Sequence, residues 1–159
     1  MFNIFKKKPK EIELYAPVSG KLVNLEDVQD PVFSKKMMGD GFAVDPTDAV
    51  IKSPADGVIS ILHDAHHAFG ITTDDGCEIL VHIGMDTVEL NGLGFKPLKA
   101  QGDKVSAGDP IIEVDFDLIK DKVPSIITPV VVTNIDEYQI AKLDLTETGN
   151  APVMIVSKK

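Results

Sequence analysis

Four histidines are the residues of this chain best suited to chemistry: His63, His66, His67 and His82. Near neutral pH an imidazole ring can act as a nucleophile, a proton carrier or a metal ligand. His82 lies in the apolar run 78–83, which is expected to form a strand. A lone histidine in a strand is most often a buried ring held by one backbone carbonyl. A chemical role for His82 therefore depends on a second group beside it.

His67 is the candidate partner, because it precedes the turn 73–76 (Thr-Asp-Asp-Gly) and His82 follows it. A two-residue hairpin loop at 74–75 places the two histidines directly opposite each other, and a loop at 75–76 makes them diagonal neighbours on one face. A three-residue loop sends them to opposite faces of the sheet, and the sequence leaves that alternative open. With a two-residue loop, we expect a pair of adjacent imidazole rings.

Two adjacent imidazoles suit three kinds of chemistry. The first is metal binding, with His63 as a third ligand because it lies four residues before His67 on the same expected strand face. The second is acid–base catalysis. The third is covalent phosphoryl carriage, in which one neutral ring is the nucleophile and the other donates a hydrogen bond to the phosphoryl oxygens. Apolar neighbours lower a histidine pKa and keep water away, which favours the third.

The elements expected around these residues are short strands rich in Val, Ile and Thr, separated by Gly, Pro and Asp turns. We expect strands at residues 21–25, 50–53, 58–62, 78–83, 111–114, 126–133 and 153–156, and short helical turns at 31–38 and 118–122. A repeated pattern of Pro, two residues, Gly and a strand links 16–23 to 53–60, with a weaker copy at 106–112. The pattern predicts an all-β fold, an antiparallel β-sandwich or distorted barrel with an internal pseudo-repeat.

Length and charge narrow the class of protein. The chain of 159 residues suits one domain, expected at 11–159, behind a separate basic segment at 1–10 (MFNIFKKKPK). That segment is expected to be a flexible tail, or else an amphipathic piece in weak contact with an anionic membrane. A net charge of −9, with no Arg, disfavours nucleic acid as a partner. The single Cys77 and the lack of a visible signal or spanning segment favour the cytoplasm.

Residues 76–88 (GCEILVHIGMDTV) closely resemble the phosphorylation-site signature of glucose-type enzyme IIA proteins of the sugar phosphotransferase system. Every fixed position of that signature is filled, including Gly76, His82, Gly84 and Thr87. Further blocks that resemble the family lie at residues 15–20, 30–33, 37–43, 67–69, 88–95, 125–130 and 132–134. The resemblance therefore spans the domain from about residue 15 to near its end.

The resemblance implies a two-step relay without a cofactor. His82 would take a phosphoryl group from the histidine-containing phosphocarrier protein and pass it to a cysteine of an enzyme IIB domain of a membrane sugar permease. His67 would stabilise the phosphoryl group, and Asp86 would lie beside the site. No metal is required, although His67 and His82 could bind zinc adventitiously. A hydrophobic ring would dock both partners, formed by Phe33, Met37, Met38, Leu80 and Val88.

The chain departs from the family pattern at two positions. The family commonly has Thr two residues before the supporting histidine, where its hydroxyl helps to orient the ring, and this chain has Ala65. His63 stands where the family usually has a bulky apolar residue, often Phe. Both changes bear on the relay rate or partner choice rather than on the role of His82. His66 falls at a variable position and is expected to face solvent.

Two other classes of protein fit parts of the sequence. A lysostaphin-type zinc endopeptidase shares a related β-architecture, with a similar stretch at 102–109, but it needs a His-x-His element, and Leu80 and Gly84 flank His82 instead. A lipoyl- or biotinyl-type carrier needs a Lys at a hairpin tip, where this chain has Asp74-Asp75-Gly76. Both therefore rank well below the phosphocarrier.

Overall fold

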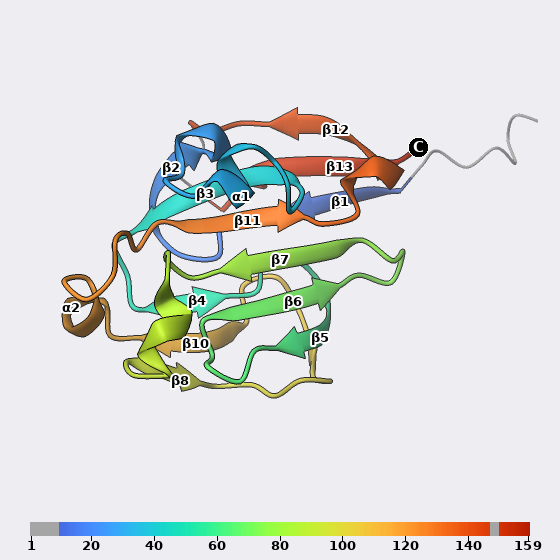
Figure 1. Ribbon diagram of the computed structural model, residues 1–159. Helices are drawn as coiled ribbons and strands as arrows, with labels where there is room; N and C mark the ends of the chain where they lie inside the picture. Colours follow the sequence, from blue (N-terminus) through green and yellow to red (C-terminus); the bar gives the residue numbers. More distant parts are fainter. Residues whose placement is uncertain (1–9, 147–149) are drawn as a thin grey trace, which may run out of the picture.

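The computed structural model describes residues 10–146 and 150–159 (Figure 1). The first strands are β1 (Glu11–Leu14), β2 (Gly20–Asn24), β3 (Asp40–Pro46), β4 (Val50–Lys52), β5 (Gly57–Leu62), β6 (Ala68–Thr72) and β7 (Glu78–His82). The later ones are β8 (Phe95–Pro97), β9 (Lys104–Val105), β10 (Pro110–Val114), β11 (Thr128–Val132), β12 (Tyr138–Leu143) and β13 (Met154–Lys158). The short helices are η2 (Leu25–Asp27), α1 (Pro31–Ser34), η3 (Thr87–Leu90), α2 (Phe116–Ile119) and η4 (Ile135–Glu137). Residues 1–9 of the predicted tail lie outside the described part of the chain.

The strands form three antiparallel sheets that stay open at their edges. The largest has the order β2-β3-β11-β7-β6-β5-β9, and the smaller ones are β1-β13-β12 and β4-β10-β8. In Figure 1 the sheet of β1, β13 and β12 lies along the top, and β4, β10 and β8 lie towards the bottom. The predicted all-β antiparallel architecture with short helical turns is confirmed. None of the helices in the described ranges is long and apolar enough to cross a bilayer.

Several strands were not expected from the sequence, and β3 shows why. Its Gly41, Asp45 and Pro46 are residues typical of turns. Gly41 is nevertheless needed inside the sheet, because a Cβ at this position would collide with the carbonyl oxygen of Val130 on β11. Glycine here permits a close approach of two backbones rather than a turn. β8 ends in Pro97 and was missed for a similar reason, whereas β1, β9 and β12 contain no such turn residue.

Side chains that alternate along the strands build the main core between the sheets. In β7, Ile79 and Val81 point into this core, whereas Leu80 and His82 are only half-buried on the other face. The largest fully buried side chains are Phe42, Phe69, Leu14, Leu25, Ile51, Ile59, Ile71, Ile79, Ile83, Ile111, Ile112 and Ile119. A continuous apolar interior of this kind holds β7, and therefore His82, in a fixed place.

A second, smaller core covers the opposite face of the large sheet next to His82. On β11, Val130 and Val132 belong to the main core and Val131 to the second one, so the two cores lie on opposite faces. The buried members of the second core are Leu25, Val28, Phe33, Ala43, Met85 and Val131. Leu25 belongs to η2 and Phe33 to α1, and η2 packs against both α1 and β3. The second core therefore forms one wall beside the histidines.

Helix α1 is shorter than predicted. Asp30 caps it, since its carboxylate accepts a hydrogen bond of 2.9 Å from the N–H of Val32, and Pro31 occupies the first turn. The helix ends at Ser34 because Lys36 adopts a left-handed conformation with φ 58°. Residues 35–38, which were expected to be helical, form an exposed turn instead.

The internal repeat is visible in the backbone hydrogen bonds. The N–H of Tyr15 donates to Pro54 O at 2.8 Å, and the N–H of Lys52 donates to Pro17 O at 2.6 Å, so the first two copies lie side by side. The N–H of Ser53 donates to Asp109 O at 2.9 Å, which joins the third copy to the second. The repeat therefore marks neighbouring turns that lead into β2, β5 and β10.

Candidate functional site

His82 is the last residue of β7, and its ring has one fixed nitrogen. Nδ1 lies 2.7 Å from Gly84 O. A carbonyl can only accept, so Nδ1 carries the proton and the neutral ring keeps a free electron pair on Nε2. Gly84 makes this bond possible, because it adopts φ 72° and a Cβ would lie 2.8 Å from Cγ2 of Thr87 and 3.0 Å from Ser125 O. The arrangement leaves Nε2 as the ring atom with a free electron pair.

The hairpin between β6 and β7 has the three-residue loop 74–76. Thr73 pairs with Cys77, the N–H of Thr73 donating to Cys77 O at 3.0 Å, and Ala68 stands opposite His82. Both predicted two-residue loops are therefore wrong. Gly76 adopts a left-handed conformation with φ 84°, so it belongs to the loop as a third residue. Strand alternation alone would send the rings of His67 and His82 to opposite faces.

The alternation of side chains along a strand does not apply to His67, because β6 begins only at Ala68. His67 is the last residue of the turn 63–67 between β5 and β6, and it follows His66, whose left-handed conformation has φ 62°. The ring of His67 lies 5.1 Å from that of His82, centroid to centroid, in an edge-to-face arrangement of 85°. The N–H of Ile83 donates to His67 O at 2.7 Å and holds the two segments together. The structure thus brings the two predicted histidines together, but through the turn before β6 and not through strand pairing.

Burial keeps both rings neutral at ordinary pH. His67 is 4% exposed, and burial, followed by the nearby His82 and His63, lowers its pKa from 6.5 to about 4. Burial also lowers the pKa of His82, although the hydrogen bond to Gly84 O and the carboxylate of Asp30 oppose part of that effect. Neutral imidazoles are the form that a nucleophile and a neutral hydrogen-bond donor require.

The other two histidines belong to the same turn. His63 is exposed, and its ring lies 4.3 Å from that of His67 at an angle of 68°. The N–H of Ala65 donates to its Nδ1 at 3.1 Å. His66 is half-buried rather than fully solvent-facing as expected.

Asp86 lies just beyond His82, in the turn that leads into η3. It is exposed, has φ 57°, and makes no capping hydrogen bond with its side chain. The hydroxyl of Thr87 donates to Ile83 O at 2.6 Å and fixes this turn against the end of β7. The carboxylate of Asp86 raises the pKa of His82 slightly against the effect of burial, which is consistent with a place beside the ring.

The side chains expected to form the docking ring lie at different depths. Met37, Val88 and Met38 are 70%, 41% and 39% exposed, and Leu80 is half-buried. Phe33 is buried in the second core, with its ring 5.2 Å from that of His82. Phe33 therefore packs against the ring of His82 from the second core and adds little exposed surface. Val32 on the same helix is exposed instead, and the sequence had not indicated it as part of an apolar surface.

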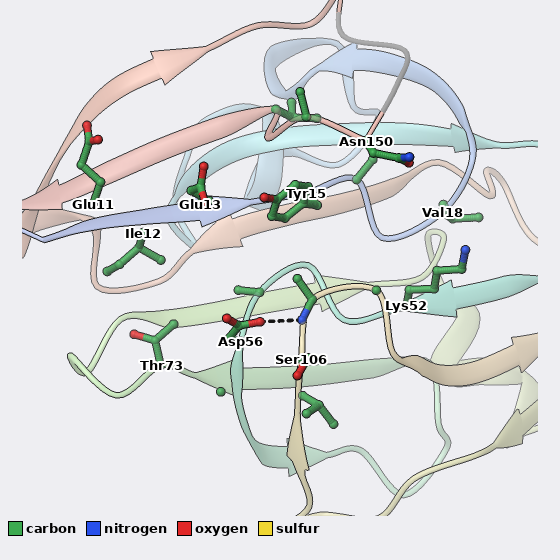
Figure 2. Close-up of a pocket in the computed structure, with 18 of the residues that line it drawn as sticks. Glu11, Ile12, Glu13, Tyr15, Val18, Lys52, Asp56, Thr73, Ser106 and Asn150 are labelled. Carbon is green, nitrogen blue, oxygen red and sulfur yellow. Dashed lines mark hydrogen bonds between the residues drawn. The ribbon is translucent and has the colours of Figure 1, made fainter.

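One hollow of the described residues lies elsewhere in the molecule (Figure 2). Tyr15, Lys52, Asp56 and Ser106 are among its lining residues, and the N–H of Ala107 donates to the carboxylate of Asp56 at 2.8 Å. No histidine lines it. The histidine pair is therefore not part of this hollow.

Neither a metal cluster nor a reactive thiol accompanies the histidines in the part of the chain that the structure describes. Within those residues, no three His, Cys, Asp or Glu side chains are arranged to hold a metal ion. Cys77 is fully buried, and burial raises its pKa to about 12. The chemistry available at this face is that of neutral imidazoles.

Comparison with known proteins places the chain in a family. A family model described as phosphoenolpyruvate-dependent sugar phosphotransferase system, EIIA 1, matches residues 12–138. The chain belongs to this family. This EIIA chain is therefore a phosphotransferase component, a phosphocarrier in sugar uptake, as the signature around His82 indicated.

Curated relatives and a solved structure agree with that assignment. A protein of Halalkalibacterium halodurans named PTS system glucose-specific EIIA component is 46% identical over 152 residues, covering 95% of this EIIA chain and 88% of the relative. A protein of the same name from Staphylococcus epidermidis is 43% identical over 139 residues, covering 87% and 84%. The structure of glucose permease IIA from Mycoplasma capricolum superimposes with a TM-score of 0.85 at 37% identity, covering 92% and 96%.

The low pKa of His67 predicts an acid-sensitive fold. Between about 6.5 and about 4 the unfolded EIIA chain binds a proton at His67 that the folded chain excludes, so the free energy of unfolding falls as pH falls through that range. The loss is roughly 2 kcal/mol at about pH 5 relative to neutral pH. Urea unfolding of the wild type and of His67→Gln, each at about pH 5 and at neutral pH, measures this loss of unfolding free energy. A wild type that loses no more stability than His67→Gln would contradict the prediction.

The departure at Ala65 predicts a second effect on His67. Its Nδ1 is buried and has no hydrogen-bond partner among the described residues of the EIIA chain. The family commonly has Thr at the position of Ala65. We therefore expect the hydroxyl introduced by Ala65→Thr to donate a hydrogen bond to Nδ1 of His67 and to stabilise the fold by about 1 kcal/mol. Ala65→Val is the matched control, since it has nearly the same shape without the hydroxyl. Equal urea midpoints for the two variants would show that no such bond forms.

Proposed function

We propose that this EIIA chain carries its phosphoryl group on Nε2 of His82. The observation that supports this most directly is the bond from Nδ1 to Gly84 O, which leaves Nε2 with the free electron pair. The same bond supports the positive charge that the ring acquires when Nε2 is phosphorylated, because the carbonyl dipole points at Nδ1–H. The nucleophile is thus oriented before any donor arrives.

The proposed relay has two balanced steps. Nε2 of His82 attacks the phosphorus of the phosphohistidine on the histidine-containing phosphocarrier protein, and the donor's P–N bond breaks with its electron pair returning to the donor ring. A thiolate of an enzyme IIB domain then attacks the same phosphorus, and the P–Nε2 bond breaks with its pair returning to His82. His67, 5.1 Å away, donates a hydrogen bond to the phosphoryl oxygens, and Asp86 lies at the edge.

Both partners dock on the apolar surface around His82, in this proposal. Met37, Met38, Val88 and Leu80 offer exposed or half-exposed apolar surface, and flexible Met side chains adapt to two different partners. The net charge of −9 favours partners with a basic face. The names of the relatives favour a glucose permease as the source of the IIB domain.

The same proposal assigns the phosphocarrier domain to residues 11–159 and the cytoplasm as its place of work, since both proposed partners act there. Residues 1–10 stay a predicted tail, with weak membrane contact as the alternative. No cofactor and no nucleic acid take part.

Intact mass spectrometry tests the proposal. The purified chain is incubated with phosphoenolpyruvate, enzyme I and the histidine-containing phosphocarrier protein, and then without phosphoenolpyruvate. We expect the mass of one phosphoryl group to appear only in the complete mixture, and to disappear after brief acid treatment as a phosphohistidine does. A chain that gains no mass, in a mixture that phosphorylates a glucose-type relative, would overturn the proposal.

A further inference from the structure

His63 has contacts that a surface histidine does not need. Its ring packs edge-to-face on the buried ring of His67, with centroids 4.3 Å apart at 68°. The N–H of Ala65 donates to its Nδ1 at 3.1 Å, so the proton of the neutral ring is on Nε2 and the ring cannot turn freely. His63 is thus an exposed residue held in one orientation against His67.

His67, in contrast, has no hydrogen bond that fixes its ring. Its Nδ1 is a buried atom without a partner within the described ranges. The aromatic rings that pack on it there are those of His63 and His82, with centroids 4.3 Å and 5.1 Å away. The backbone bond from Ile83 N–H fixes where His67 lies, but the orientation of its ring depends on packing, and His63 supplies the closer of these two ring contacts.

We propose that His63 is a positioning residue that holds the ring of His67 over His82 and thereby speeds discharge of the phosphoryl group. The inference rests on the proposed role of His82 as carrier. The turn 63–67 makes this possible: the N–H of His66 donates to His63 O at 2.8 Å and that of His63 to Ala68 O at 3.0 Å, so the turn closes on itself and brings His63 and His67 to the same side. His63 acts through His67 and does not touch the phosphoryl group.

Discharge kinetics test the proposal. The phosphorylated chain is mixed with an enzyme IIB domain, and kcat and KM for that acceptor are measured for the wild type, His63→Ala and His63→Phe. We expect His63→Ala to lower kcat about tenfold with KM unchanged, and His63→Phe, which keeps an aromatic edge, to stay within about twofold of the wild type. His66→Asn is the matched control, because Asn tolerates the left-handed backbone and this change removes an imidazole from the same turn. It should leave kcat unchanged.

A double variant separates positioning from other effects. In a His67→Ala background His63→Ala should cause no further loss, since the residue through which it acts is gone. A full tenfold further loss in that background, a wild-type kcat for His63→Ala, or a His63→Phe variant as slow as His63→Ala would each overturn the proposal.

A spectroscopic readout keeps this result distinct from failure of the carrier role. In the unphosphorylated protein, nuclear Overhauser contacts between the rings of His67 and His82 should weaken in His63→Ala and persist in His63→Phe and His66→Asn. If the wild type takes no phosphoryl group, the carrier role fails, and these contacts still decide whether His63 positions His67. If the wild type is phosphorylated and the contacts persist in His63→Ala, only the positioning role fails.

Discussion

His82→Ala is expected to abolish phosphorylation of this chain by phosphoenolpyruvate, enzyme I and the histidine-containing phosphocarrier protein. The loss should be at least about a thousandfold in rate, because no other group can replace a covalent nucleophile. His67 cannot take over, since it is only 4% exposed and a partner's phosphoryl group cannot reach it. Intact mass after incubation with the complete donor mixture measures the result.

His82→Gln is the control that separates chemistry from structure. Its amide N–H can still donate to a nearby carbonyl such as Gly84 O, so the turn after β7 is retained while the imidazole is lost. Both variants should unfold in urea close to the wild type, because the ring of His82 is only half-buried. A phosphorylated His82→Gln chain would show that the carrier is a different residue.

His67→Ala is expected to separate acceptance of the phosphoryl group from its delivery. Acceptance should continue, because Nε2 of His82 and its bond to Gly84 O do not involve His67. Discharge to an enzyme IIB domain should fall about a hundredfold, since one hydrogen-bond donor to a charged transition state typically contributes that much. Rapid-quench measurement of phosphoryl transfer in each direction gives the two rates.

His67→Gln tests whether a hydrogen-bond donor is the property that matters. A glutamine amide can donate from near the place of the imidazole nitrogen, so its discharge rate should lie between those of His67→Ala and the wild type. Full sugar uptake, or wild-type discharge, in the His67→Ala variant would exclude a role for His67 in delivery.

The sequence was sufficient to single out His82 as the candidate residue and to predict the antiparallel all-β architecture. The signature 76–88 singled out His82, and the family match over residues 12–138 agrees with the resemblance on which that choice was based. Short Val- and Ile-rich runs between Gly and Pro turns predicted an antiparallel all-β fold, because strand and turn preferences are local. Strands such as β3 were missed because Gly41 and Pro46 are read locally as turn residues, while their role depends on a neighbouring strand.

The geometry of the histidine pair could not be derived in the same way. Local turn chemistry favoured a two-residue loop, and the actual three-residue loop would have separated the rings if His67 had belonged to β6. The deciding feature is the left-handed backbone of His66, for which the sequence offers no Gly or Asn as a signal. Likewise, the burial of Phe33 next to His82 depends on helix α1 packing into the second core.

The sequence by itself thus singled out the residue proposed as the nucleophile and determined the kind of sheet that carries it. Only the tertiary structure decided that His67 faces His82, that its ring is neutral with a pKa of about 4, and that His63 packs on it. The physical reason is one of range. Strand and turn preferences act between residues close in the chain, whereas burial, ring contacts and the course of a turn depend on segments brought together only by the fold.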